Sequence, residues 1–178
     1  MKILKTAVVG LGRIGWQFHA PEIKKNPGFE LVAAVDPVAD RRAEAEKEYG
    51  LRAYADYAEM LAAEKLDLVV IASPTNLHKE QAIAALEKGI DVFCDKPMAP
   101  SLADADEMIS AMRRTGRKLM VFQPHRAGAD AQTAKKIIES GLLGPVFVFK
   151  RSLSGYVRRN DWQAQRKFGG GMINNYGA

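Results

Sequence analysis

The chain has 178 residues, of which 26 are Lys or Arg and 21 are Asp or Glu, so its formal net charge is +5. This length suits one domain, or one domain and part of another. A hydrophobic fraction of 47% excludes a disordered chain, and no apolar run approaches the roughly 18 residues that a membrane helix needs. A single cysteine excludes an intramolecular disulfide framework. Because the amino terminus also lacks a secretory signal pattern, we expect a cytoplasmic protein.

Pairs of basic residues are spread along the chain rather than gathered in one element. They are Lys24-Lys25, Arg41-Arg42, Arg113-Arg114, Lys135-Lys136 and Arg158-Arg159. A nucleic-acid-binding protein would concentrate such residues on one element. We therefore expect neither a nucleic acid nor a membrane as a partner. A mildly basic surface does suit an anionic small ligand such as a dinucleotide.

Five short apolar runs alternate with helical patterns in the first two-thirds of the chain. The runs cover residues 6–9, 29–35, 66–72, 91–94 and 118–122, and the helical patterns include residues 38–49, 76–88, 101–114 and 131–140. Runs without polar alternation are typical of strands buried on both faces of a parallel sheet. A further helix is expected after Asp56, which stands three residues before Glu59 in the spacing of a capping box, and Ser101 precedes Asp104 in the same way. The pattern predicts an α/β fold with a doubly wound parallel sheet.

The pattern changes after Gly144-Pro145. Residues 146–151, VFVFKR, predict one more strand, and the stretch that follows is polar, glycine-rich and aromatic. A lone strand cannot bury its face. We therefore expect residues from about 145 onward to begin a second domain.

The sharpest local motif is GLGRIG at residues 10–15, which follows the first strand and opens a helix. In a GxGxxG loop, Gly10 permits the tight turn, Gly12 lets the backbone approach a pyrophosphate, and Gly15 lets the helix pack on the strand. The helix amino terminus supplies free N–H groups for phosphates. The loop predicts a dinucleotide cofactor, with Gly10, Gly12, Arg13, Ile14 and Gly15 as candidate contacts.

Asp36 ends the second predicted strand. A carboxylate at this place can accept hydrogen bonds from both hydroxyls of the adenosine ribose and would repel a 2′-phosphate, which favours NAD over NADP. Arg41 and Arg42 lie nearby and could reach a phosphate, so NADP stays open as an alternative. Asp36 could also serve only as a turn residue before Pro37.

A third candidate loop follows the strand LDLVVIA. Its residues Ser73, Pro74, Thr75, Asn76 and His78 stand at the carboxyl end of a strand, where doubly wound sheets bind ligands. Helix capping alone could explain Thr75 and Asn76, and His78 could equally be a surface residue.

The fourth strand ends at Asp95-Lys96-Pro97. A lysine at the ligand-binding edge can hydrogen-bond a substrate hydroxyl and act as acid or base while a hydride leaves the same carbon. The alternative is a surface lysine in a turn. Cys94 is expected as a buried strand residue rather than a nucleophile. Because His19 and His125 show no metal-ligand spacing, we expect no metal site.

Together these motifs resemble the glucose–fructose oxidoreductase and inositol dehydrogenase family (Gfo/Idh/MocA). The matching stretches are AVVGLGRIG, VAAVDP, SPTNLH, CDKP in place of the usual E-K-P, and the GGG at residues 169–171. The resemblance covers essentially the whole chain. It implies a Rossmann dinucleotide-binding domain over residues 1–124. It also implies that residues 125–178 begin an α/β substrate and oligomerisation domain, which is incomplete in this chain.

The resemblance also implies the chemistry. Family members typically oxidise a secondary alcohol of a sugar or polyol, or reduce the corresponding ketone, with NAD(P). Lys96 falls on the family's catalytic lysine, and Asp95 replaces the common glutamate beside it. Asn175 falls where an aspartate is usual, before a histidine that would follow Ala178. Because an asparagine can orient a hydroxyl but cannot act as a carboxylate base, this polypeptide lacks the complete proton relay.

The function expected from these features is an NAD-dependent oxidoreductase acting on a sugar or polyol, forming a homo-oligomer in its full-length form. One alternative is a redox glycosidase of the same family, which would cleave glycosides through transient oxidation at C3 without net production of NADH. Another is a non-catalytic dinucleotide-binding module, suggested by Asn175. The chain alone is expected to be weakly active or inactive, because an incomplete second domain cannot exclude water from the site.

Overall fold

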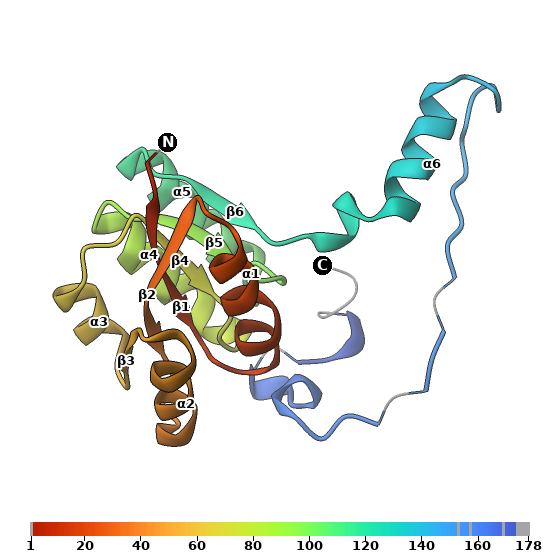
Figure 1. Ribbon diagram of the computed structural model, residues 1–178. Coiled ribbons are helices and arrows are strands. Elements are labelled where there is room, and N and C mark those ends of the chain that lie inside the picture. Colours follow the sequence, from red (N-terminus) through yellow and green to blue (C-terminus); the bar gives the residue numbers. More distant parts are fainter. Residues whose placement is uncertain (1, 153, 157, 169, 174–178) are drawn as a thin grey trace. The chain divides into compact units, whose positions relative to one another are not determined.

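The computed structural model describes residues 2–152, 154–156, 158–168 and 170–173 (Figure 1). Residues 123–160 form a unit of their own, and the large unit is built on residues 1–122. Each unit is described by itself below.

The large unit is built around one six-stranded sheet. Its strands are β1 (Leu4–Val9), β2 (Phe29–Val35), β3 (Arg52–Tyr54), β4 (Leu68–Ile71), β5 (Asp91–Cys94) and β6 (Leu119–Val121). They lie in the order β3-β2-β1-β4-β5-β6, and every neighbouring pair is parallel. The chain runs outward from β1 to β3 and then resumes at β4 on the other side of β1. The predicted doubly wound Rossmann sheet is therefore confirmed, and its strand order reverses between β1 and β4.

Helices cover both faces of this sheet (Figure 1). Those of the large unit are a π-helical segment η1 (Gly15–His19), α1 (Ala20–Lys25), α2 (Ala39–Tyr49), α3 (Tyr57–Ala63), a 3₁₀ turn η2 (Thr75–Leu77), α4 (His78–Glu87) and α5 (Leu102–Thr115). Two further 3₁₀ turns are η4 (Trp162–Ala164) and η5 (Arg166–Phe168). The small unit has a 3₁₀ turn η3 (Pro124–Ala127) and α6 (Ala129–Glu139). Among the described residues, none of these helices has the length and apolarity needed to cross a bilayer.

Two apolar layers explain why the strands lack polar alternation. Alternate strand residues such as Val9 and Ile71 pack with Met60 and Leu86 from α3 and α4 on one face. The intervening residues, such as Val8, pack with α1 and α2 on the other face. Because the central strands β1 and β4 are buried on both faces over most of their length, a continuous apolar run is the pattern that their burial requires.

The predicted helix starts at Asp56 and Ser101 are confirmed. The Asp56 carboxylate accepts a hydrogen bond from the backbone N–H of Glu59, at 2.9 Å. The Ser101 hydroxyl accepts one from the backbone N–H of Asp104, at 3.2 Å. Both contacts satisfy N–H groups that the first helical turn leaves without partners.

The prediction of a strand at residues 146–151 is wrong. These residues have no strand assignment, and among the described residues they pair with no other strand. An apolar run forms a strand only when a neighbour completes its hydrogen-bond ladder. Conversely, strand β3 was not predicted, because its three residues, Arg52–Tyr54, are too few to show a hydrophobic pattern.

Helix η1 follows the glycine loop as one π-helical turn rather than an α-helix. The backbone N–H of Ala20 bonds to the carbonyl of Gly15, five residues earlier. This wider turn leaves Gly15 and His19 buried.

The tight packing of Gly15 supports a prediction about stability. An added Cβ at Gly15 would lie 1.8 Å from the carbonyl oxygen of Gly10, a backbone atom that cannot swing aside, whereas a Cβ at Gly12 would meet nothing within 4 Å. Gly15→Ala should therefore lower the free energy of unfolding by about 1–3 kcal/mol, as overpacking does. Gly12→Ala, the matched control, should change it by less than about 0.5 kcal/mol. Urea unfolding followed by circular dichroism measures both, and equal effects of the two changes would contradict the packing argument.

Candidate functional site

Four loops at one edge of the sheet carry the residues singled out from the sequence. Gly10, Asp36 and Asp95 each follow the last residue of a strand, and Ser73 stands two residues beyond the end of β4. Backbone hydrogen bonds hold neighbouring loops together, from the N–H of Gly10 to Val35, of Ala72 to Val9, and of Asp95 to Ile71. Since all strands are parallel, these loops share the carboxyl edge, next to the point where the strand order reverses.

The glycine loop runs close against the loop after β4. Gly10 has φ of 92°, which an L-residue rarely adopts. A Cβ on Gly10 would lie 2.8 Å from the backbone nitrogen of Ser73, so no side chain fits there. Gly12 faces open space instead, and Arg13 is exposed while Ile14 is half-buried. The loop therefore presents bare backbone to a ligand at Gly12.

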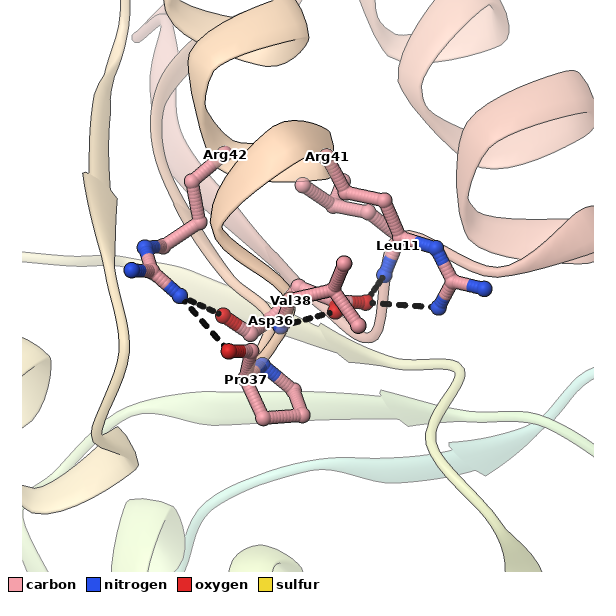
Figure 2. Close-up of polar contacts among 6 residues, drawn as sticks. All are labelled: Leu11, Asp36, Pro37, Val38, Arg41 and Arg42. Carbon is pink, nitrogen blue, oxygen red and sulfur yellow. Dashed lines mark hydrogen bonds and ion pairs between the residues drawn. The ribbon is translucent and has the colours of Figure 1, made fainter.

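The Asp36 carboxylate fastens the glycine loop to the end of β2 (Figure 2). Asp36 is only 2% exposed. Its Oδ2 accepts a hydrogen bond from the backbone N–H of Leu11, at 2.8 Å, and its Oδ1 accepts one from the N–H of Val38, at 2.9 Å. A buried carboxylate needs such donors. The predicted phosphate loop and the predicted ribose ligand are therefore in direct contact.

Two arginines surround the same turn (Figure 2). Nη1 of Arg41 lies 3.3 Å from Oδ2 of Asp36, and its side chain is 49% exposed. Nη1 of Arg42 donates to the carbonyl oxygens of Asp36 and Pro37, at 2.8 and 2.9 Å. Arg42 thus stabilises the backbone of the turn, whereas Arg41 neutralises the carboxylate.

The loop after β4 contains a buried hydroxyl without a partner. Ser73 donates from Oγ to Oε1 of Gln81, at 2.6 Å. Thr75 is 1% exposed, and its Oγ1 has no hydrogen-bond partner among the described residues. Neither Thr75 nor Asn76 caps η2 or α4, because the N-cap residues of these helices are Pro74 and Leu77 and neither makes a side-chain cap. The capping alternative is therefore wrong, and the buried Thr75 hydroxyl keeps an unused hydrogen-bonding capacity among the described residues.

His78 is not a surface residue, because it is 1% exposed. Its Nδ1 lies 2.9 Å from the carbonyl oxygen of Pro97, and its Nε2 lies 2.9 Å from the carbonyl oxygen of Ser73. The ring therefore bridges the loop after β4 and the loop after β5. It makes both contacts from inside the fold, because its side chain is buried.

Asp95 forms a hydrogen bond with His19. The sequence predicts Asp95 as a cofactor contact, whereas His19 was considered only as a possible metal ligand. Nε2 of His19 donates to Oδ1 of Asp95 across 2.9 Å, with side chains 5% and 14% exposed. Lys96 follows in the same loop and is half-buried. No local pattern marks His19 as a partner of Asp95, because the two residues are far apart in the chain.

Cys94 is fully buried at the end of β5. Burial, and to a lesser extent the charge of Asp95, raises the pKa of its thiol, so it is an inert packing residue rather than a nucleophile. Asn175 lies outside the described residues, as does Gly169 of the GGG stretch. Within the described part of the chain, no group of three or more His, Cys, Asp or Glu side chains is arranged to hold a metal ion.

The residues present fit a dinucleotide. The open backbone at Gly12, the Asp36 carboxylate beside it and the unsatisfied hydroxyl of Thr75 all lie on loops of the carboxyl edge. Bare N–H groups suit phosphates, a carboxylate suits ribose hydroxyls, and a lone hydroxyl suits a polar ligand atom.

Known proteins with the same architecture bind NAD. The chain resembles a structure of an NAD-binding protein from Listeria innocua with a TM-score of 0.85 and 31% identity, covering 99% of this chain and 52% of that one. It also resembles scyllo-inositol dehydrogenase from Lactobacillus casei, solved with NAD(H) and scyllo-inositol, with a TM-score of 0.76 and 29% identity over 80% of this chain and 43% of that one. Among curated proteins, D-glucoside 3-dehydrogenase of Escherichia coli is 34% identical over 82% of this chain and 42% of its own length.

The chain spans about half the length of the curated relatives it matches. The family model described as the oxidoreductase family with an NAD-binding Rossmann fold matches residues 4–123, which hold the glycine loop, Asp36 and Lys96. With the fold, the carboxyl-edge loops and this match in agreement, the chain belongs to the Gfo/Idh/MocA oxidoreductase family and carries its NAD-binding domain.

Proposed function

We propose that this chain is the cofactor-binding part of an NAD-dependent dehydrogenase that acts on a secondary alcohol, or the corresponding ketone, of a sugar or polyol. The observation that carries the proposal is the hydrogen bond from the Leu11 N–H to the buried carboxylate of Asp36. It brings the candidate pyrophosphate loop and the candidate ribose ligand together at the carboxyl edge of the sheet. This is the arrangement that dinucleotide recognition requires.

Asp36 is the residue expected to select NAD. Its two oxygens together have about four lone-pair sites, and the N–H groups of Leu11 and Val38 use two of them. The remaining capacity can receive ribose hydroxyls, whereas a 2′-phosphate would meet a negative charge. NADP stays the weaker alternative, because Arg41 could turn toward a phosphate only by leaving Asp36.

Lys96 is the residue proposed to move the proton. NAD, when bound, supplies the hydride acceptor or donor. Oxidation of an alcohol also releases the hydroxyl proton, which a neutral amine at Lys96 can accept, and the resulting ammonium can return it to a ketone oxygen during reduction. Asn175 is proposed to orient the substrate hydroxyl.

The substrate class is supported by the names of relatives. The Lactobacillus structure contains scyllo-inositol, a cyclic polyol, and the Escherichia relative is named for oxidation of a glucoside at position 3. Both molecules offer secondary alcohols. We extend this substrate class, a cytoplasmic location and assembly as a homo-oligomer to the complete protein as parts of the same proposal.

A second candidate function is glycoside cleavage through transient oxidation at C3. It is favoured by the name of the Escherichia relative, since oxidation at that carbon is the first step such a reaction needs. In that case the hydride removed from C3 returns to the sugar, and NADH does not accumulate.

Asp36→Ala should weaken NADH binding. Loss of a charged hydrogen-bond partner is worth about 1.5–3 kcal/mol, which corresponds to roughly 10- to 100-fold in affinity. NADPH binding should fall less, because the substitution also removes the charge that opposes the 2′-phosphate. Titration of each nucleotide by nicotinamide fluorescence measures both effects.

A matched control for that experiment is Asp67→Ala. Asp67 also accepts a backbone N–H, from Lys5 at 3.0 Å, but it precedes β4 at the opposite edge of the sheet. Its loss should leave the affinity for both nucleotides unchanged. Equal weakening of NADH and NADPH by Asp36→Ala would count against the ribose role and indicate a loosened loop.

Lys96→Ala should lower turnover far more than cofactor binding. In the complete protein, initial rates of NADH formation with myo-inositol, scyllo-inositol and methyl glucosides should fall by at least about 100-fold, the usual contribution of a general acid or base. Lys88→Ala, which removes an exposed lysine after α4, is the control and should leave the rates unchanged. A Lys96→Ala protein that retains wild-type rates would refute the assignment.

Product analysis separates the two candidate functions. The dehydrogenase should accumulate one NADH for each polyol oxidised, because the hydride stays on the cofactor. The glycosidase should release sugar from a methyl glucoside while absorbance at the NADH band stays flat. Sugar release without NADH would replace the first proposal by the second.

A further inference from the structure

Two of the three histidines of this chain are buried on either side of the lysine loop. His19, at the end of η1, contacts the residue before Lys96. His78, at the start of α4, contacts the residue after it. The two histidines come from different helices, and both lie within the large unit.

The contact of His19 is enclosed by aromatic rings. The ring of His19 lies 5.0 Å from that of Phe122, 5.5 Å from that of Phe18 and 5.9 Å from that of Phe93, measured between centroids. With its side chain 5% exposed, the ring has little room to change orientation. Nε2 therefore stays directed at Oδ1 of Asp95, at 2.9 Å, and this interaction fixes the start of the lysine loop.

The contact of His78 fixes the other end of the loop. Nδ1 meets the carbonyl oxygen of Pro97 while Nε2 meets that of Ser73, both at 2.9 Å. A carbonyl oxygen only accepts hydrogen bonds and a neutral imidazole carries one N–H, so the ring donates to one of these two carbonyls, and we assign that hydrogen to Nδ1, toward Pro97. The carbonyl of Pro97 is thereby tied to the loop after β4, which the hydrogen bond from Ser73 to Gln81 anchors in turn on α4.

We propose that His19 and His78 are positioning residues that together hold the backbone of Lys96 in place at the cofactor-binding edge. The inference rests on the proposed function, in which Lys96 is the proton-transferring group. The sequence also offers His78 as a candidate cofactor contact, but the positioning role requires neither histidine to touch substrate or cofactor. His19 acts through the side chain of Asp95, and His78 acts through the carbonyl of Pro97.

The geometry allows each contact to be removed and restored separately. A glutamine amide can replace the Nε2 donor of histidine, whereas an asparagine amide can replace the Nδ1 donor. His19→Gln therefore keeps a donor toward Asp95, and His19→Leu removes it. His78→Asn keeps the donor toward Pro97, and His78→Gln moves the donor toward Ser73 instead. Both variants of His78 carry one buried amide donor, so they differ chiefly in which carbonyl that donor faces.

The experiment measures how fast acetic anhydride modifies Lys96, by peptide mass spectrometry, with Lys88 as the internal reference. In the wild type, Lys96 is half-buried. Release of one end of its loop should raise the rate at Lys96 relative to Lys88 by about tenfold, the factor that corresponds to one hydrogen bond in a local opening equilibrium. We expect this increase in His19→Leu and His78→Gln, and rates near the wild type in His19→Gln and His78→Asn.

Three results would overturn the proposal. The first is an unchanged Lys96 rate in His19→Leu and His78→Gln. The second is an equal increase in His78→Asn and His78→Gln, because a merely structural histidine would not distinguish them. The third is a parallel increase at Lys88, which would indicate general unfolding. Asp95→Ala breaks the His19 contact from its more exposed side and should reproduce the His19→Leu result if that variant does not fold.

The proposed function is tested separately in the same samples. Fluorescence titration with NADH shows whether the chain binds the cofactor, and it does not depend on the lysine loop being held. A wild type that binds no NADH would refute the proposed function while the acetylation rates still report on the two histidines. Conversely, normal NADH binding with unchanged acetylation in all variants would refute only the positioning role.

Discussion

A buried carboxylate must find hydrogen-bond donors, and this requirement organises the carboxyl edge of the sheet. Asp36 takes its donors from the backbone of the glycine loop and from the turn after β2. Asp95 takes its donor from the ring of His19. In both cases one donor comes from the segment that follows β1, Leu11 for Asp36 and His19 for Asp95. The glycine loop and its helix are thereby joined to the loops after β2 and β5, and these two carboxylates hold the loops of the candidate site together.

The sheet and the site loops could be predicted because their signals are local. An apolar run such as residues 29–35, buried on both faces, and a cap such as Ser101 depend only on neighbours in sequence. Asp36 was recognisable for the same reason, since it closes a strand at a known interval from the glycines. Its contact with Leu11 follows once β1 and β2 are paired.

The remaining features depend on distant partners. The contacts of His19 with Asp95 and of His78 with Pro97 leave no local signal, because these partners lie on the loop after β5. The run at residues 146–151 has the composition of a strand, yet composition cannot supply the neighbour that would complete its ladder. Periodicity therefore identified which residues are buried, whereas it could not identify which of them meet across the sheet.

The Asp36 contacts also suggest how the ribose could be admitted without disturbing the fold. The bonds from Leu11 and Val38 are short and come from the backbone, so losing them would leave donors and a buried charge unsatisfied. The pair with Arg41 is longer, at 3.3 Å, and the arginine side chain is half-exposed, so solvent weakens this contact. When a ribose displaces Arg41, the protein loses only the weak ion pair, and the ribose hydroxyls gain a charged acceptor. The backbone contacts meanwhile keep the carboxylate in place. One carboxylate can thus select NAD through the lone pairs that face the ligand and stabilise the glycine loop through its backbone contacts.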